Sequence, residues 1–86
     1  MSTSVRAMAL SFDDHTMWVE LDDGRSLGIP LAWFPRLMQA TAEQRNAFRI
    51  SPSGNGLHWP DLDEDISVEG LIAGRGDRTA VGPKAA

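Results

Sequence analysis

Apolar and polar side chains alternate along the first third of the chain, in the pattern of strands with one buried face. The alternating apolar positions are Met8, Leu10 and Phe12 in a first run and Met17, Val19 and Leu21 in a second. Successive side chains of a strand point to opposite faces of its sheet, so each run predicts a half-buried strand. Asp13-Asp14-His15 is the turn expected between them.

A third strand is predicted by the segment that follows the second run. Asp23-Gly24 separates that run from Ser26 to Ile29. An Asp-Gly pair between apolar runs is a strong hairpin signal, because a type I′ turn needs positive φ at both central positions. We therefore expect a three-stranded antiparallel meander whose apolar face needs a cover.

Helical spacing begins directly after the third predicted strand. The apolar positions that recur there are Leu31, Phe34, Leu37 and Met38. Pro35 is tolerated in the first turn of a helix, so a short turn and then a helix beginning near Phe34 are predicted. Thr41-Ala42-Glu43-Gln44 resembles a capping box and predicts a second short helix that ends near Ala47.

The second half of the chain predicts another hairpin and one more helix. Phe48 to Ser51 and Leu57 to Trp59 are expected to pair as strands across the turn formers of residues 52–56. Ser67 is a suitable N-cap for a short helix, and Gly74 suits its C-terminal end. The fold class is therefore α+β: a meander covered by one or two short helices, a second hairpin and a short C-terminal helix.

Length and composition bound the organisation of the chain. With 86 residues, one small domain is expected, spanning residues 1–74. From Arg75 onward, Gly, Pro, Ala and charged residues dominate without periodicity, so residues 75–86 are predicted to be a disordered tail.

Charge and cysteine content exclude several classes of function. The net charge of −4 and the pI near 4.9 argue against direct nucleic-acid binding, which needs a basic face. The absence of cysteine excludes disulfides, thiolate metal sites and cysteine nucleophiles. No stretch resembles a signal peptide or a membrane span, so a cytoplasmic protein without membrane contact is expected.

Three motifs, taken in order, resemble one protein family. They are Asp23-Gly24-Arg25, the segment from Pro30 to Leu37, and the segment from Trp59 to Ile66. Together, across Leu21 to Gly74, the chain resembles the small bacterial family called domain of unknown function 2442. The resemblance implies an α+β fold and no established activity. Some relatives look like neighbours of another small protein, as in toxin–antitoxin modules, or like fusions to a helix-turn-helix domain, for which this chain lacks the length.

The acidic run after Trp59 is a candidate cation site. Asp61, Asp63 and Asp65 match the first three ligand positions of an EF-hand loop. The match then fails, because Ile66 replaces the required glycine and Ile72 replaces the bidentate glutamate. A solvated acidic turn before a helix is favoured over a weak hard-cation site, and no metal or cofactor is expected.

No catalytic constellation emerges from the remaining polar residues. His58 stands beside Trp59 and close to Asp61, where a carboxylate could orient it as a general base. An isolated histidine in a strand is more often a surface residue paired across strands. Nucleophile elbows and phosphate-binding loops are absent from the sequence. A non-enzymatic role is favoured, although these patterns leave the question of activity open.

The tryptophans carry the remaining functional signal. Trp18 lies on the strand face opposite Met17 and Val19, so one face of the sheet cannot bury all three side chains. Either the helices cover Trp18, or it is exposed as an interface anchor. Phe34 and Trp59 are expected to pack as core, whereas Trp33, which points in a different direction from Phe34, either joins them against the second hairpin or faces outward.

Two functional hypotheses follow. The first is a protein-interaction or regulatory module, similar to the antitoxin of a small bacterial pair, which binds a protein partner and uses Trp18 and the acidic residues. The second is a small-molecule or anion site built from Trp33, Trp59 and either Arg25 or Arg36. Self-association through a free sheet edge is a further expectation.

Overall fold

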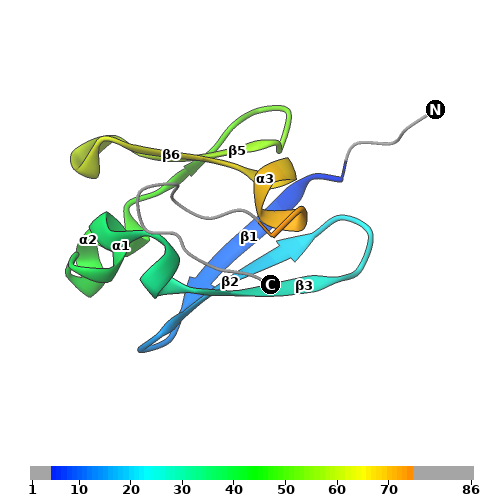
Figure 1. Ribbon diagram of the computed structural model, residues 1–86. Coiled ribbons are helices and arrows are strands. Elements are labelled where there is room, and N and C mark those ends of the chain that lie inside the picture. The colour runs from blue at the N-terminus through cyan, green and yellow to red at the C-terminus, as the bar shows by residue number, and fades with distance from the viewer. Residues whose placement is uncertain (1–4, 75–86) are drawn as a thin grey trace.

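Two three-stranded antiparallel sheets face each other across one apolar core in the computed structural model of the chain (Figure 1). Three short α-helices complete the α+β architecture, which confirms the predicted fold class. The structure describes residues 5–74, so the predicted tail of residues 75–86 lies outside the described residues.

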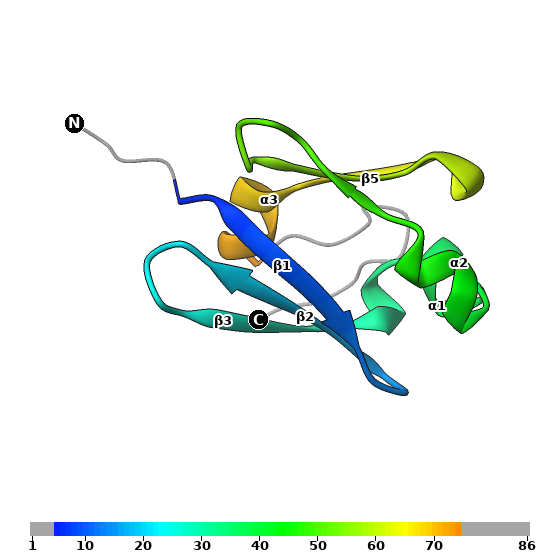
Figure 2. The same ribbon diagram turned by 180° about the vertical axis from the view of Figure 1, so that it is seen from behind.

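The first sheet is the predicted meander. Its strands are β1 (Ala7–Phe12), β2 (Thr16–Leu21) and β3 (Ser26–Pro30), with β2 in the centre. Figure 2 shows the three strands from behind, with β1 crossing in front of β2.

A β-bulge near the start of β1 changes which side chains the strand buries. Ala7 is opposite Leu21, whereas Ala9 is opposite Glu20, so one extra residue lies between these pairs. The extra residue reverses the alternation. Met8 is consequently 62% exposed while Ala7 is buried. The expectation that Met8 shares the buried face of Leu10 and Phe12 is therefore wrong.

The turn between β2 and β3 has a different geometry from the predicted type I′ turn. Gly24 has a φ of 93°, but Asp23 does not have a positive φ. The Leu21 amide donates to the Arg25 carbonyl at 2.8 Å, and the Gly24 amide donates to the Leu21 carbonyl at 3.2 Å. Residues 22–24 thus lie between the hydrogen-bonded Leu21 and Arg25, and Gly24 still supplies the left-handed conformation that closes the turn.

Short helical segments connect the two sheets, much as the apolar spacing predicts. A 3-10 turn, η1 (Leu31–Trp33), precedes α1 (Pro35–Met38), in which Pro35 occupies the first turn. The capping box of α2 (Ala42–Asn46) is confirmed. The Gln44 amide donates to the Thr41 hydroxyl at 3.1 Å, and the Thr41 amide donates to the Gln44 side chain at 2.9 Å.

The second sheet extends the predicted hairpin by one strand. Its strands are β4 (Arg49–Ile50), β5 (Gly56–Trp59) and β6 (Glu64–Ser67), and the 3-10 turn η2 (Pro60–Leu62) joins the last two. Part of the acidic run therefore forms a strand and not a turn. The reason is that Ile66 turns into the core opposite Leu57 and draws its acidic neighbours into the ladder.

The last described helix, α3 (Val68–Ile72), closes the core from the side of the second sheet. Its predicted N-cap is confirmed, since the Ser67 hydroxyl accepts from the Gly70 amide at 3.2 Å. Gly74 follows the helix with a φ of 81°.

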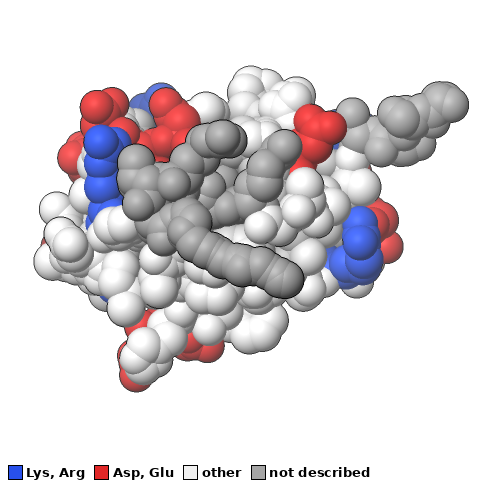
Figure 3. All heavy atoms as spheres, viewed as in Figure 1, with Lys and Arg blue, Asp and Glu red and all other residues white. Residues whose placement is uncertain are grey.

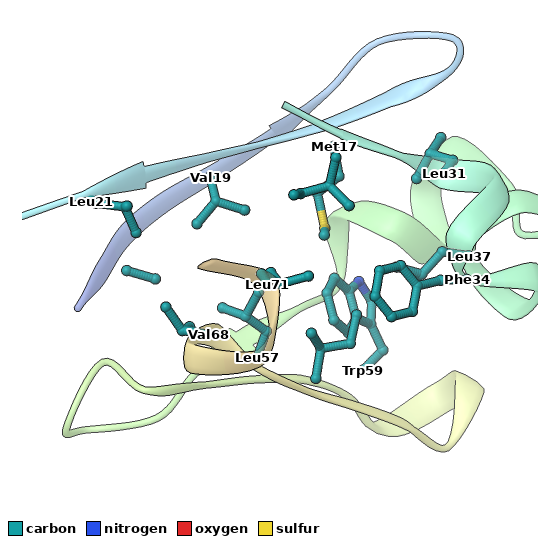
Figure 4. Packing of buried hydrophobic residues seen from close by; sticks show 13 residues of the cluster. Met17, Val19, Leu21, Leu31, Phe34, Leu37, Leu57, Trp59, Val68 and Leu71 are labelled. Atoms are coloured by element: carbon teal, nitrogen blue, oxygen red, sulfur yellow. The ribbon is translucent and has the colours of Figure 1, made fainter. Parts of the chain in front are cut away.

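The core lies between the meander, the second sheet and α3 (Figure 4). Met17, Val19 and Leu21 point from β2 toward Val68 and Leu71 of α3 and the residues of β5. The second sheet and α3 thus cover the meander together with the short helices.

Trp59 is the largest fully buried side chain. Its indole packs near the ring of Phe48, at 6.5 Å between centroids, and its Nε1 donates to the Arg45 carbonyl at 2.9 Å. The indole therefore joins β5 to the C-terminal end of α2.

Candidate functional site

The solvent-facing side of the meander is built mostly from small side chains around one tryptophan. Because Met17, Val19 and Leu21 turn inward, the alternate residues of the three strands turn outward. We refer to these positions as the outer face, and all of them are exposed: Ala9, Ser11, Trp18, Glu20, Ser26 and Gly28.

Gly28 provides the floor under the Trp18 indole. The two residues are opposite each other across β2 and β3. A Cβ atom at Gly28 would lie 2.8 Å from Cζ3 and 2.9 Å from Cη2 of the indole. The benzene ring of Trp18 therefore lies over β3 in space that only glycine leaves free. With 41% of the residue exposed, the indole remains open to solvent on its other side.

Asp13 fixes the opposite end of the same ring. Trp18 Nε1 donates to Asp13 Oδ2 at 3.1 Å, while Asp13 Oδ1 accepts from the amides of Thr16 at 2.9 Å and His15 at 3.2 Å. These hydrogen bonds, that from Trp18 above all, lower the pKa of Asp13. The indole is thus exposed and at the same time held in one orientation, which settles the open question about Trp18.

Arg25 is engaged in the turn between β2 and β3. Its Nε donates to Asp23 Oδ2 at 2.7 Å, and its amide donates to Asp23 Oδ1 at 3.0 Å. The amide is the first cause of a lowered pKa of Asp23. Arg25 and Asp23 therefore brace the β2–β3 turn.

Arg36 ties α1 to the turn between η2 and β6. Its Nη1 donates to the Asp63 carbonyl and lies 3.7 Å from Oε1 of Glu64, whose side chain is only 11% exposed. Asp63 reaches this position with a left-handed backbone at a φ of 54°. The structure thus brings Arg36 and Asp63 together as a joint between segments.

The predicted aromatic pair does not form an open ligand site. Trp59 is fully buried and its N–H is already hydrogen-bonded within the fold, so it has no surface for a ligand. Trp33 is half-buried at the end of η1. The small-molecule hypothesis therefore loses the contact with Trp59 on which it was based.

His58 pairs with Asp65 and not with Asp61. These residues are opposite each other on β5 and β6, and His58 Nδ1 lies 2.8 Å from Asp65 Oδ1. Asp61 lies on η2 and Asp63 in the turn after it. The structure therefore spreads the three aspartates of the EF-like pattern over separate elements. Within residues 5–74, no three Asp, Glu, His or Cys side chains gather as a metal site.

Asp13 and Gly28 position the Trp18 indole, a role that the sequence does not predict for either residue. Asp13 was assigned to a turn and Gly28 to a strand, without a role for either. A glycine inside a strand often marks a close approach of another group. The type I′ turn predicted at Asp23-Gly24 would put Ile29 opposite Trp18, so the role of Gly28 follows only from the register that the structure shows.

Across the described part of the chain, no helix has the length and apolar character needed to cross a membrane.

Comparison with known proteins agrees with this fold. A crystal structure of a protein of unknown function from Rhodospirillum rubrum matches with a TM-score of 0.75 and 32% identity, over 95% of each chain. An NMR structure of an uncharacterised protein from Chromobacterium violaceum matches with a TM-score of 0.70 and 29% identity. That match covers 83% of this chain and 67% of the other. No curated protein shows significant similarity to the chain. The family model described as a protein of unknown function, DUF2442, matches residues 7–77. The suspected resemblance is thus confirmed, and the chain belongs to the DUF2442 family.

Proposed function

We propose that this protein is a non-enzymatic interaction module that binds a protein partner through the outer face of its meander. One observation carries the proposal: Trp18 is exposed, yet Gly28 and Asp13 hold its indole in one orientation. The core closes without the Trp18 side chain, and the packing of the indole on Gly28 still leaves 41% of the residue exposed.

A fixed and exposed indole is well suited to binding. Tryptophan is enriched among the residues that contribute most to protein interfaces. Ordering a side chain at an interface costs about 0.5–1.5 kcal/mol, and folding has already met that cost for Trp18. The small neighbours Ala9, Ser11 and Gly28 leave the ring accessible to a partner's surface.

Within this proposal, the module has a regulatory role. It binds a small bacterial protein in the cytoplasm and regulates its activity, as an antitoxin does. Self-association through an edge of the first sheet is the competing assembly. The β3 edge is poorly suited to it, because Pro30 at its end has no amide to donate.

The test compares two tagged variants with the wild-type chain in affinity capture from the source organism. Trp18→Ala removes the indole, and Met38→Ala is the control because Met38 is equally exposed, at 40%, on α1. We expect one stoichiometric partner with the wild type and with Met38→Ala, and its loss with Trp18→Ala. Equal capture by all three proteins would show that the outer face is not the binding surface.

A further inference from the structure

The geometry points to the chemistry of the partner: an arginine side chain that stacks on the Trp18 indole, with its charge between the carboxylates of Asp13 and Glu20. This inference rests on the proposed function, since it names what the outer face would bind. It follows from the charges around the ring, from the open side of the ring and from the fixed position of its N–H.

The carboxylates beside Trp18 face no arginine side chain within residues 5–74, and His15 is the basic residue next to Asp13. Asp13 contacts the ring N–H, and Glu20 stands two residues after Trp18 on the same side of β2. The side-chain carboxylates of Asp14, next to Asp13, and of Glu20 make no hydrogen bond or ion pair within residues 5–74. The hairpin tip between β1 and β2 shows acidic atoms at the lower left of Figure 3.

The arginines of the described residues are engaged elsewhere or lie on other elements. Arg6, Arg25 and Arg36 each pair with an acidic residue. Arg45 donates to the carbonyls of Leu37 and Met38, and Arg49 lies on β4 of the second sheet. Residues 5–74 contain eleven acidic side chains and five arginines. A cation that approaches the outer face therefore meets attraction from Asp13, Asp14 and Glu20, with His15 as the neighbouring basic side chain and no arginine engaged there.

Arginine fits this surface better than lysine. A planar guanidinium can lie parallel to an indole and still donate N–H groups in its plane to carboxylates on either side. Gly28 closes one side of the Trp18 ring and leaves the other side for such a stack. Because Asp13 holds the indole N–H, the ring keeps its position when a cation arrives.

The experiment titrates the full chain with three acetylated, amidated pentapeptides that differ only at two positions. These positions hold arginine, lysine or citrulline. Citrulline keeps the planar shape of the arginine side chain but carries no charge. The indole N–H resonance of Trp18, assigned with Trp18→Phe, is followed by NMR. We expect saturable shifts with the arginine peptide, about fivefold weaker binding of the lysine peptide and no saturation with citrulline. Equal binding of the arginine and lysine peptides would overturn the inference.

Two variants test the role of the carboxylates. Glu20→Gln is expected to weaken binding of the arginine peptide several-fold, whereas Glu43→Gln, on the exposed α2, leaves it unchanged. An unchanged affinity of Glu20→Gln contradicts the inference. If the Trp18 resonance of the free protein depends on protein concentration, a second copy occupies the outer face and the inference is again wrong.

The outcomes separate this inference from the proposed function. If a partner is captured in a Trp18-dependent way but the arginine peptide gives no response, the proposed protein interaction is supported and the inference about arginine is wrong. If the arginine peptide binds saturably but no partner is captured, the inference about arginine is supported and the proposed protein interaction is not.

Discussion

Trp18 and Gly28 act as a pair on the outer face, because the glycine provides the space that the indole fills. Two strands and one turn contribute to the same arrangement: β2 carries the ring, β3 its floor, and the β1–β2 turn its hydrogen-bond acceptor. At the scale of single residues, the exposed indole therefore depends on two neighbours with no large side chain of their own.

Gly28→Ala should displace the indole without unfolding the protein. A Cβ atom would overlap the ring, but the ring is the exposed end of a side chain and can swing into solvent. Alanine is favoured over glycine inside a strand by about 0.5–1 kcal/mol, which offsets the lost contact. We expect the free energy of unfolding in urea to change by less than ~1 kcal/mol while the Trp18 indole resonance moves. An unmoved resonance would show that Gly28 does not position the ring.

Asp13 should make the stability of the protein depend on acid pH. Its pKa is lowered in the fold, so its contribution is fully present above the ordinary aspartate pKa and is lost as pH falls through the lowered value. His15, whose amide donates to the same carboxylate, is the nearby basic group. We expect the Trp18 indole resonance to titrate below the ordinary aspartate pKa. Asp13→Asn should abolish that titration, and its persistence would assign it to another group.

At the scale of elements, one tight turn couples the two sheets. Gly54, in the turn between β4 and β5, accepts a hydrogen bond at 2.7 Å from the amide of Ala7 at the start of β1. Gly54 is buried with a φ of 77°, and a Cβ atom there would lie 2.5 Å from Cβ of Arg6. The turn can approach β1 so closely only because the residue has no side chain.

Gly54→Ala should destabilise the protein more than Gly24→Ala. Both glycines have positive φ, so both substitutions introduce backbone strain of about 1 kcal/mol. At Gly24 no atom lies within 4 Å of the added Cβ, whereas at Gly54 the Cβ overlaps Arg6. We expect a loss of about 1 kcal/mol for Gly24→Ala and at least ~2 kcal/mol for Gly54→Ala in urea unfolding. Equal losses would mean that the turn and β1 move apart at little cost.

At the scale of the whole molecule, one buried indole connects distant parts of the core. Trp59 lies between β5, the neighbouring Phe48 and the end of α2, and its N–H satisfies the Arg45 carbonyl. Arg45 in turn donates to the carbonyls of Leu37 and Met38 at the end of α1. The helical connection between the sheets thus depends on a residue of the second sheet.

Trp59→Phe should lower the free energy of unfolding by about 2–4 kcal/mol, because it leaves a cavity in the core and removes the hydrogen bond to the part-buried Arg45 carbonyl. Trp33→Phe is the matched control, since Trp33 is only half-buried, and a loss below ~1 kcal/mol is expected for it. Chemical denaturation measures both variants. A loss of similar size for the two would contradict the central role given to Trp59.

The sequence was informative where a local pattern determines the structure. Alternation at Met17, Val19 and Leu21 predicted β2, and the Thr41–Gln44 box predicted α2. It was uninformative where distant pairing decides the outcome. The bulge that exposes Met8 depends on the register with β2, and the strand character of Glu64 to Ser67 depends on the partner β5.

The candidate site was only partly predictable for the same reason. The alternation around Trp18 predicted only that it faces away from Met17 and Val19, and it left open which of the two faces is covered. The floor at Gly28 needed the exact pairing of β2 with β3, and the anchor at Asp13 needed the geometry of a turn. The burial of Trp59 depends on Phe48, Arg45 and the core, which no spacing along the chain specifies.

The order of the elements has a consequence for synthesis on the ribosome. The meander, residues 7–30, leaves the exit tunnel first, whereas much of its cover comes from residues 56–72. Until Val68 and Leu71 emerge, the inward side chains of β2 have no partners from α3 and remain accessible to other apolar surfaces. The nascent chain is therefore most prone to aggregation, and most dependent on chaperones, between the completion of β3 and the arrival of α3.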